Sequence, residues 1–436
     1  MTIVWSLIGF LFGTLAFGDI YSSLSFAGFF FVLYRIFNKS SDIIVFREFA
    51  IFLYILNYLI SPIISYSLPS ELIVYKMQLP KDIYLMIAFW GIVFFVVGIY
   101  SFKTQVFNFK LSKIKRVTNL NSAFLKKITI VTILTSFVYK SLPEQFAFVA
   151  YLFTLLKYTS SFSLYLSNRR LWYYPVGVLS ISLLGSFLSG MFHDSVIWII
   201  FFGIILVYQV RINFFVKLLS VVFFFIFILF IQSIKEEYRR LTWTGEQEAS
   251  IELVGNVGIR NFENDRVAND DNLFSALNRA NQAWILASTI DNVNRNFDFQ
   301  GFEHATIYLE AVFLPRFLAP DKIRSGDKEI FNKYSGHTIG SGTSMGLGVF
   351  ADGYIAFGPM GVCIFGFVLG LLFSIVFKIC EYWSRVSPYY ALLLLPLLSY
   401  AIRPDCELQT TLNHLFKGLV LYGVFFYLTS RKFSIE

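Results

Sequence analysis

Charged side chains are scarce in this sequence of 436 residues, where Asp, Glu, Lys and Arg together make up 15%. Soluble globular domains carry about 25%. Hydrophobic residues make up 56% of the chain, which leaves too few charges to cover a water-exposed surface. The composition excludes a soluble protein and indicates one embedded in a membrane.

Cysteine is rare in the sequence, and no basic region precedes the first apolar stretch. The three cysteines, Cys363, Cys380 and Cys406, lie in or beside apolar stretches, so no disulfide framework is indicated. The stretch 1–17 is apolar but has no basic region in front of it, and a second apolar run follows at once. We expect a first membrane span here rather than a cleaved signal peptide.

The signatures of many soluble enzymes are absent. The sequence has no phosphate-binding glycine loop ending in Gly-Lys-Ser/Thr, no His-Glu-x-x-His, no Cys-x-x-Cys and no Asp-x-Asp of nucleotide-sugar transferases. Use of ATP or nucleotide sugars is therefore not expected. The four histidines are scattered at 193, 304, 337 and 414, so we expect no metal site and no cofactor.

The sequence does contain a series of long apolar stretches. A span needs about 20 residues to cross a hydrocarbon core of ~30 Å, fewer if its ends snorkel or the membrane thins. Such stretches lie near 3–18, 20–37, 49–68, 83–102, 127–142, 145–166, 171–192, 195–210, 213–234, 355–378, 387–402 and 413–430. We expect an all-α polytopic membrane protein with about twelve transmembrane helices.

The orientation follows from Lys and Arg, which concentrate in short cytoplasmic loops. With the N-terminus inside, the cytoplasmic side collects Arg35, Lys39, Arg47, Lys103, Lys110, Lys113, Lys115, Arg116, Lys126, Lys127, Arg169, Arg170, Arg211, Lys217, Lys378, Arg385, Arg431 and Lys432. The opposite short loops hold Lys76, Lys81, Lys140 and Arg403. Both termini are therefore expected in the cytoplasm.

One large polar segment, 235–343, falls on the non-cytoplasmic side. It carries 12 Lys and Arg against 16 Asp and Glu, whereas the rest of the chain carries 24 against 12. A nucleic-acid binder concentrates positive charge on one soluble face, so nucleic acid is not an expected partner. We expect three parts: a bundle of about nine helices over 1–234, a periplasmic or extracellular helical loop over 235–343, and a bundle of about three helices over 344–436.

Helical periodicity continues inside the polar segment. Asp271 can cap a helix that carries Leu273, Leu277, Ala280, Trp284 and Ala287 on one face. A second helix is expected from Gly301 to just before Pro315, with Ile307, Ala311 and Leu314 on its apolar stripe. The glycine-rich run 335–348 is expected to link back into the membrane.

Five cations of the non-cytoplasmic side could meet an anion: Arg279, Arg316, Lys322, Arg324 and Arg403. Arginine suits a diphosphate because its planar fork bonds two oxygens at once and stays charged. The alternative is that they form ordinary loop salt bridges or contact lipid headgroups. Arg403 is the stronger candidate because it lies at the outer end of an apolar span.

Two histidines could take part in chemistry. His304 and Tyr308 are four residues apart on one helix face, so both could address one cavity, with His304 as a base near neutral pH. The alternative is a solvated or hydrogen-bonded histidine. The pair His193-Asp194 lies at another outer span end and could form a charge pair.

Three stretches resemble bacterial polysaccharide repeat-unit polymerases, the Wzy-type O-antigen and capsule polymerases. They are Arg279 to Trp284, Leu314 to Lys322 and Thr343 to Gly358. Asp352, Tyr354 and Phe357-Gly358 match an acidic-x-aromatic pattern followed by Phe-Gly, although the family more often has Glu at the acidic place. The turn from Ile402 to Asp405 is similar to an Arg-containing turn of the family, which usually has Gly where Pro404 stands.

The resemblance implies a fold related to the membrane glycosyltransferases called GT-C and a location in the bacterial inner membrane. It implies a metal-independent reaction in which a glycan leaves undecaprenyl diphosphate and joins a second lipid-linked repeat unit. Asp352, His304 and Tyr354 become the candidate catalytic residues. Arg279, Arg316, Lys322, Arg403 and Trp284 become candidates for binding the substrate. A chain-length regulator and a flippase are the implied partner proteins.

Other functions remain open on sequence grounds. An O-antigen ligase would share the leaving group and differ in the acceptor. A flippase or secondary transporter would suit a dozen spans with Lys157 inside one of them, although such proteins seldom need an outer segment of this size. A structural subunit is the last alternative.

Overall fold

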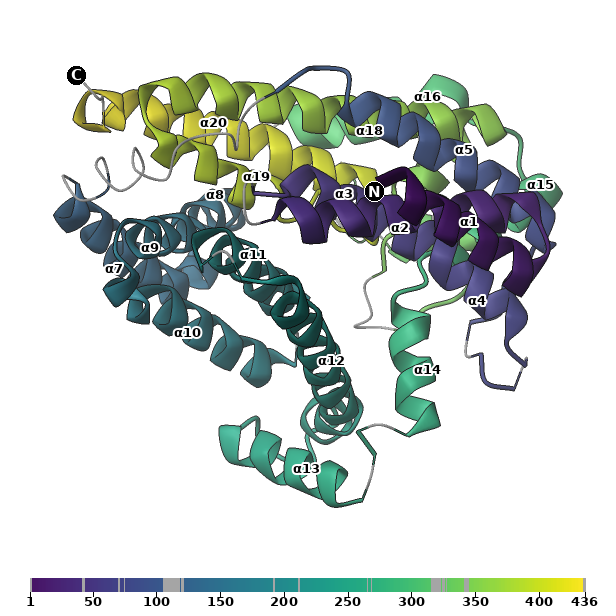
Figure 1. The fold of residues 1–436 in the computed structure, drawn as a ribbon, viewed down its shortest axis with the longest axis horizontal. Coiled ribbons are helices and arrows are strands. Elements are labelled where there is room, and N and C mark those ends of the chain that lie inside the picture. The colour runs from purple at the N-terminus through teal and green to yellow at the C-terminus, as the bar shows by residue number, and fades with distance from the viewer. Residues whose placement is uncertain are drawn as a thin grey trace.

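The computed structural model describes residues 2–40, 44–69, 71–73, 75–104, 118, 121–190, 193–210, 212–264, 266–267, 269–314, 323, 326, 328–340 and 345–433. Every regular element within these ranges is a helix (Figure 1). The expected all-α fold class is therefore confirmed for the described part of the chain.

The helices fall into three groups along the chain. The first group is α1 (Thr2–Phe17), α2 (Ile20–Lys39), α3 (Phe46–Ile55), the π-helix η1 (Leu56–Ile60), α4 (Ser61–Ser67), α5 (Lys81–Ile99), α7 (Ser122–Val138), η2 (Tyr139–Ser141), α8 (Glu144–Thr154), α9 (Leu156–Ser167), η3 (Arg169–Leu171), α10 (Tyr173–Ser189), α11 (His193–Val210) and α12 (Phe214–Trp243). The second is α13 (Ile251–Glu263), α14 (Asp270–Arg279), α15 (Ala283–Asn296), α16 (Gly301–Phe313) and α17 (Lys328–Ser335). The third is α18 (Val349–Val386), η4 (Pro388–Leu393), α19 (Leu394–Leu398) and α20 (Leu408–Phe433).

Seven helical stretches of the described chain are long and apolar enough to cross a membrane. They are Ile20–Lys39, Phe46–Ser67, Lys81–Ile99, Ser122–Ser141, Arg169–Ser189, Phe214–Thr242 and Val349–Val386. Shorter apolar helices cover Thr2–Phe17, Asp194–Val210 and Pro388–Leu398. The two other expected spans fall on the α8–α9 pair and on α20. These helices indicate a multi-pass membrane protein, and the number of twelve crossings stays a prediction.

Helices α5 and α18 pack against each other at two glycines. A Cβ atom added to Gly98 would lie 2.3 Å from the Phe367 carbonyl oxygen, and one added to Gly370 would lie 2.2 Å from that of Phe95. Both distances are shorter than any van der Waals contact, so the two backbones touch only because neither glycine has a side chain. Small residues serve the same purpose at many membrane helix interfaces.

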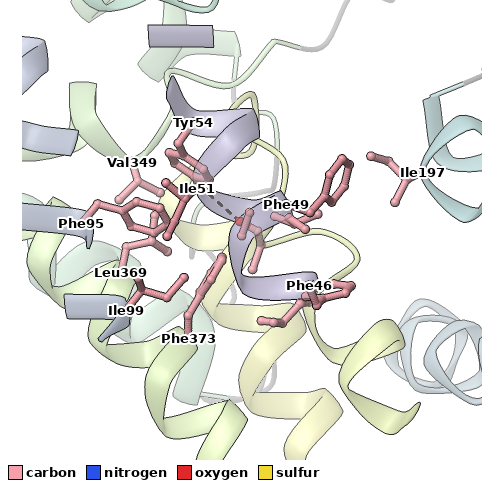
Figure 2. Packing of buried hydrophobic residues seen from close by; sticks show 14 of the residues in the cluster. Phe46, Phe49, Ile51, Tyr54, Phe95, Ile99, Ile197, Val349, Leu369 and Phe373 are labelled. Atoms are coloured by element: carbon pink, nitrogen blue, oxygen red, sulfur yellow. Dashed lines mark hydrogen bonds between the residues drawn. The ribbon is translucent and has the colours of Figure 1, made fainter. Parts of the chain in front are cut away.

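Large aromatic side chains of α3 fill the space beside this pair. Figure 2 shows Tyr54 facing Phe95 of α5, with the two rings stacked at 4.5 Å between centroids. At the other end of α3, the Phe46 ring packs against the Phe201 ring of α11, with 4.9 Å between the ring centroids. Helix α3 therefore connects the α5–α18 pair to α11, one of the helices from α7 to α12.

The expected span 387–402 consists of η4, α19 and a short loop, and it runs antiparallel to α20. Near one end the Tyr390 hydroxyl lies 2.8 Å from that of Thr429, and near the other Ser399 Oγ lies 3.3 Å from His414 Nε2. All residues of η4 and α19 are buried, so this segment contacts protein on every side.

The polar segment differs from its predicted form in three respects. The single helix expected from Asp271 to Ala287 is two helices, α14 and α15, separated by a turn at 280–282. Asn269, and not Asp271, is the N-cap, because its side chain accepts a hydrogen bond from the Asn272 backbone. Helix α12 also continues past residue 234 to Trp243, so the expected boundary at 234/235 falls inside a helix.

Helix α16 has the predicted bounds but a different buried face. It runs from Gly301 to Phe313, as expected. Of the predicted apolar stripe only Ala311 is buried, whereas Ile307 and Leu314 are exposed. The buried face carries His304 and Tyr308 instead, because a carboxylate lies beneath them.

Candidate functional site

The Asp352 carboxylate is the centre of a buried polar cluster. Its Oδ1 accepts a hydrogen bond from the Tyr308 hydroxyl at 2.8 Å and lies 3.2 Å from His304 Nε2. Its Oδ2 accepts the backbone N–H of Leu408 at 3.1 Å. The side chain of Asp352 is fully buried and that of His304 is 4% exposed.

This cluster joins three helices. Asp352 lies in the first turn of α18, which begins after Gly348 at φ +86°, a conformation that favours glycine. Leu408 is the first residue of α20, so the carboxylate also meets the positive end of that helix. Tyr308 comes from α16, and burial, with the neighbouring Asp352 charge, raises the pKa of its hydroxyl well above the usual value. The phenol therefore remains a donor at neutral pH.

The third candidate catalytic residue does not join the cluster. The Tyr354 hydroxyl donates instead to Asn294 Oδ1 of α15 at 2.8 Å. Tyr354 is two positions after Asp352 along α18, so the two side chains leave the helix in different directions. The structure thus brings Asp352 and His304 together, adds Tyr308, and leaves Tyr354 apart.

Trp284 lies at the start of α15 in a small aromatic stack. Its ring lies flat against Tyr75, with centroids 4.2 Å apart, and meets the edge of His337 at 5.3 Å. Trp284 is 5% exposed and Tyr75 is 40% exposed. Tyr75, rather than Trp284, therefore presents the aromatic surface that solvent or a ligand can reach.

Three cations meet where α12 and α14 pack together. Lys235 and Arg239 are four residues apart on one face of α12, and Arg279 is the last residue of α14. Arg279 and Arg239 both act electrostatically on Lys235, and Asp405 is an opposite charge that acts on it. Gln232 of α12 donates to Ser275 of α14 at 3.1 Å, which fixes the two helices side by side.

Arg403 lies in the loop before α20 and is held by two carboxylates. Its Nη1 donates to Asp194 Oδ1 at 2.8 Å, and its Nη2 donates to Asp405 Oδ2 at 2.9 Å. Its guanidinium also lies 5.2 Å from the centre of the Tyr400 ring. Asp405 pairs with Arg403 and is also the opposite charge that acts on Lys235, whereas the convergence of Arg279 and Arg403 stays a prediction.

The loop that carries Arg403 is fixed from inside the bundle. The Tyr54 hydroxyl donates to the Ala401 carbonyl at 3.1 Å, and the Tyr58 hydroxyl donates to the Pro404 carbonyl at 3.0 Å. Tyr58 belongs to the π-helix η1, an irregularity often found near functional sites. Together with the Asp352–Leu408 bond, these contacts hold 401–408 at three points.

Some predicted residues lie outside the described part of the chain, and some functional candidates were missed. Arg316, Lys322 and Arg324 are not described. Lys235 and Arg239 were not predicted, although two cations four residues apart at the end of an apolar run were a usable signal.

Among the described residues, no group of three or more His, Cys, Asp or Glu lies close enough together to hold a metal ion.

A family profile described as "Domain of unknown function (DUF8712)" matches residues 78–385. No curated protein and no solved structure matches the chain. The matched range contains Lys235, Arg239, Arg279, His304, Tyr308 and Asp352, and it ends before Arg403 and Leu408. Because this match spans more than half of the sequence, the chain belongs to the DUF8712 family.

Proposed function

We propose that the protein is a membrane glycosyltransferase that polymerises lipid-diphosphate-linked oligosaccharide repeat units on the outer face of the inner membrane. The observation that supports this most directly is the pair of arginines Arg239 and Arg279, with Lys235 next to them, at one end of a membrane-length helix. A lipid-linked diphosphate presents its two phosphates at the same level, just outside the acyl chains.

Glycosyl transfer from a diphosphate is favoured by cations next to the leaving group. The bond between the sugar anomeric carbon and the diphosphate oxygen breaks, a bond to the acceptor hydroxyl forms, and the hydroxyl proton passes to a base. The departing diphosphate gains negative charge, and fixed cations stabilise that state more than the ground state. Arg279 is exposed and is the candidate for direct contact, whereas Lys235 and Arg239 are half-buried behind it.

The Asp352 cluster suits a positioning role better than that of a base. A base must lie within hydrogen-bond reach of the hydroxyl that it deprotonates. Both Asp352 oxygens already accept from protein donors, and His304 is nearly sealed from solvent. In this proposal Asp352 aligns α16, α18 and the start of α20, and so sets the position of the loop that carries Arg403.

The test compares Arg279→Ala, Arg239→Ala and Lys235→Ala with the matched control Arg240→Ala. Arg240 neighbours Arg239 on α12 but is exposed and pairs with Glu246. We expect loss of polymer by about 100-fold or more in the cluster variants, by analogy with lost oxyanion donors, and none in the control. Arg279→Lys should restore little, because lysine lacks the bidentate fork. Full-length polymer from all three cluster variants at equal membrane abundance would refute the proposal.

A transporter of lipid-linked glycans is the second candidate, and one observation favours it. Lys157 is 8% exposed within α9, directly after the break between α8 and α9 at Leu155. Charged residues near broken helices at mid-membrane often mark transport sites. Deleting the gene separates the functions: loss of a polymerase leaves single repeat units on the cell surface, whereas loss of a flippase or ligase removes those too.

A further inference from the structure

Helix α13 turns back along α12 to form a helical hairpin. The Gln247 N–H donates to the Leu241 carbonyl at 2.9 Å in the turn, and Asn261 Nδ2 donates to the Ser233 carbonyl at 2.8 Å further down. A Cβ atom added to Gly258 would lie 3.2 Å from the Phe230 ring. The second half of α13 is therefore level with Phe230 and Ser233 of α12.

That level belongs to the membrane-crossing part of α12. No Asp, Glu, Lys or Arg occurs between Lys217 and Lys235. Phe223, Phe225 and Ile226 of this run are 71%, 51% and 52% exposed, as expected for side chains that face lipid. The return helix thus descends beside the last turns of a membrane span.

The surface of α13 has three strips of different chemistry. The packed strip is Leu253, Val254 and Val257, which contact Ile234, Tyr238 and Leu241 of α12. A second strip, at the i, i+8, i+11 spacing of one helix side, is apolar and 56%, 59% and 70% exposed at Ile251, Ile259 and Phe262. The polar strip between them is Glu252, Asn256, Arg260 and Glu263.

We propose that the second half of α13 enters the membrane surface, with Ile259 and Phe262 of the apolar strip in the acyl region of the leaflet on the side of the polar segment. An amphipathic helix that lies in an interface has this division into an apolar and a polar exposed side. Ile259 and Phe262 flank Gly258 and Asn261, which are level with Phe230 and Ser233 in the uncharged run of α12, so the outer part of the same lipid layer covers them. The ion pair of Arg260 with Glu237 lies on the polar side, where headgroups and water are.

This placement rests on α13 and not on the proposed enzymatic function, but it sets the depth of the cation group. Lys235 follows Ile234 at the end of the uncharged run, and Arg239 is about 6 Å further along the helix at 1.5 Å per residue. Both cations therefore lie at the level of lipid phosphates.

The test uses nitroxide labels on the full-length protein in vesicles of phosphatidylethanolamine and phosphatidylglycerol. Single cysteines are placed at Ile259→Cys and Phe262→Cys in the apolar strip, and at Glu252→Cys and Asn256→Cys in the polar strip as matched controls on the same helix. The native Cys363, Cys380 and Cys406 are replaced by alanine. We expect oxygen to collide with the strip labels more often than a water-soluble nickel chelate does, and the reverse order at the controls.

Two outcomes would overturn the proposal. More frequent nickel collisions at both strip positions would place them in water, and few collisions with either reagent would mean that protein covers the strip. If the cysteine-free protein fails to fold, Phe262→Trp and Asn256→Trp in the native background replace the labels. Brominated lipids should then quench the added fluorescence of the first and not of the second, and equal quenching would equally overturn the proposal.

Discussion

Asp194 and Arg403 are 209 residues apart in the chain, yet Arg403 Nη1 donates to Asp194 Oδ1 at 2.8 Å. Asp194 lies in the first turn of α11, and Arg403 lies in the loop before α20. The ion pair therefore joins the α7–α12 group to the C-terminal helices. Asp194 is 48% exposed on its side chain, so water screens the pair on one side.

We expect a small coupling energy between these two residues. Exposed ion pairs contribute about 0.2–1 kcal/mol, and Arg403 keeps Asp405 as a second partner when Asp194 is removed. A double-mutant cycle with Asp194→Ala and Arg403→Ala, measured by thermal unfolding in detergent, gives this energy. A coupling of several kcal/mol would instead indicate a fully desolvated pair.

The Tyr308→Phe variant tests the Asp352 cluster. A hydrogen bond to a charged group contributes about 1.5–3 kcal/mol, so the variant should be destabilised by that order. The pKa of Tyr308 is raised in the folded state, so wild type loses this advantage only as pH rises above about 10, where the unfolded tyrosine ionises first. The difference in unfolding free energy between wild type and variant should stay constant from about pH 6 to 9. A difference that does not fall between about pH 10 and 11 would contradict the raised pKa, because an unshifted tyrosine ionises equally in both states.

The Tyr58→Phe variant tests the support of the Arg403 loop. It removes the donor to the Pro404 carbonyl and leaves that carbonyl unpaired, at a cost of about 1–3 kcal/mol. Cys406 of the same loop is 6% exposed, and burial raises the pKa of its thiol. We therefore expect slow alkylation of Cys406 in the wild type and faster alkylation in the variant.

Tyr66→Phe is the matched control for this experiment. The Tyr66 hydroxyl donates to another backbone carbonyl, that of Leu79, at 2.9 Å, away from the Arg403 loop. Alkylation of Cys406, identified by mass spectrometry, should keep its wild-type rate in this variant. Equal acceleration in both variants would mean general loosening and not release of the loop.

The α5–α18 contact predicts opposite effects for two glycine substitutions. In Gly98→Ala the added methyl group would collide with the Phe367 carbonyl, which should cost about 1–3 kcal/mol. In Gly203→Ala on α11 the methyl group meets nothing within 4 Å, and alanine favours a helix by about 1 kcal/mol. The midpoint temperature of thermal unfolding should fall in Gly98→Ala and stay the same or rise in Gly203→Ala. Equal behaviour would argue against the backbone contact.

The topology stays a prediction that labelling can check. Basic loop residues predict that Lys127 faces the cytoplasm and that Glu248 faces the opposite side. Both side chains are exposed, so either position accepts a cysteine. A membrane-impermeant maleimide applied to intact cells with a permeabilised outer membrane should modify Glu248→Cys and not Lys127→Cys, with the wild type as background. The reverse pattern would invert the topology.

The sequence predicts the helices of this protein better than its site, for physical reasons. Apolar run length is enough to find membrane helices, and Gly301 and Pro315 mark the ends of α16. The break at 280–282 has no Pro or Gly, because its cause is tertiary: Asn281 donates to Ser65 at 2.9 Å and also accepts the Ala283 N–H at 3.2 Å.

The candidate site depends on contacts between distant parts of the chain. The resemblance to polysaccharide polymerases points to Asp352, but its bond to the Leu408 backbone spans 56 residues and leaves no mark on the sequence. Lys235 and Arg239 give a weak signal in the sequence, because the first charge after an apolar run often marks the end of a membrane helix. Helix α12 instead continues for two further turns, which carry both cations to Arg279.

The α5–α18 contact, a seam of glycines between the two helices, also has a consequence for the synthesis of the protein. The Phe102 N–H at its end bonds Ser374 Oγ at 3.0 Å across 272 residues. At about 5–20 residues per second, a ribosome needs roughly 10 to 50 s to deliver α18 after α5 has emerged. During that time the glycine face of α5 waits in the membrane without its partner. The seam therefore closes late in synthesis, and a substitution at Gly98 should yield chains that insert normally and fail only at this final docking step.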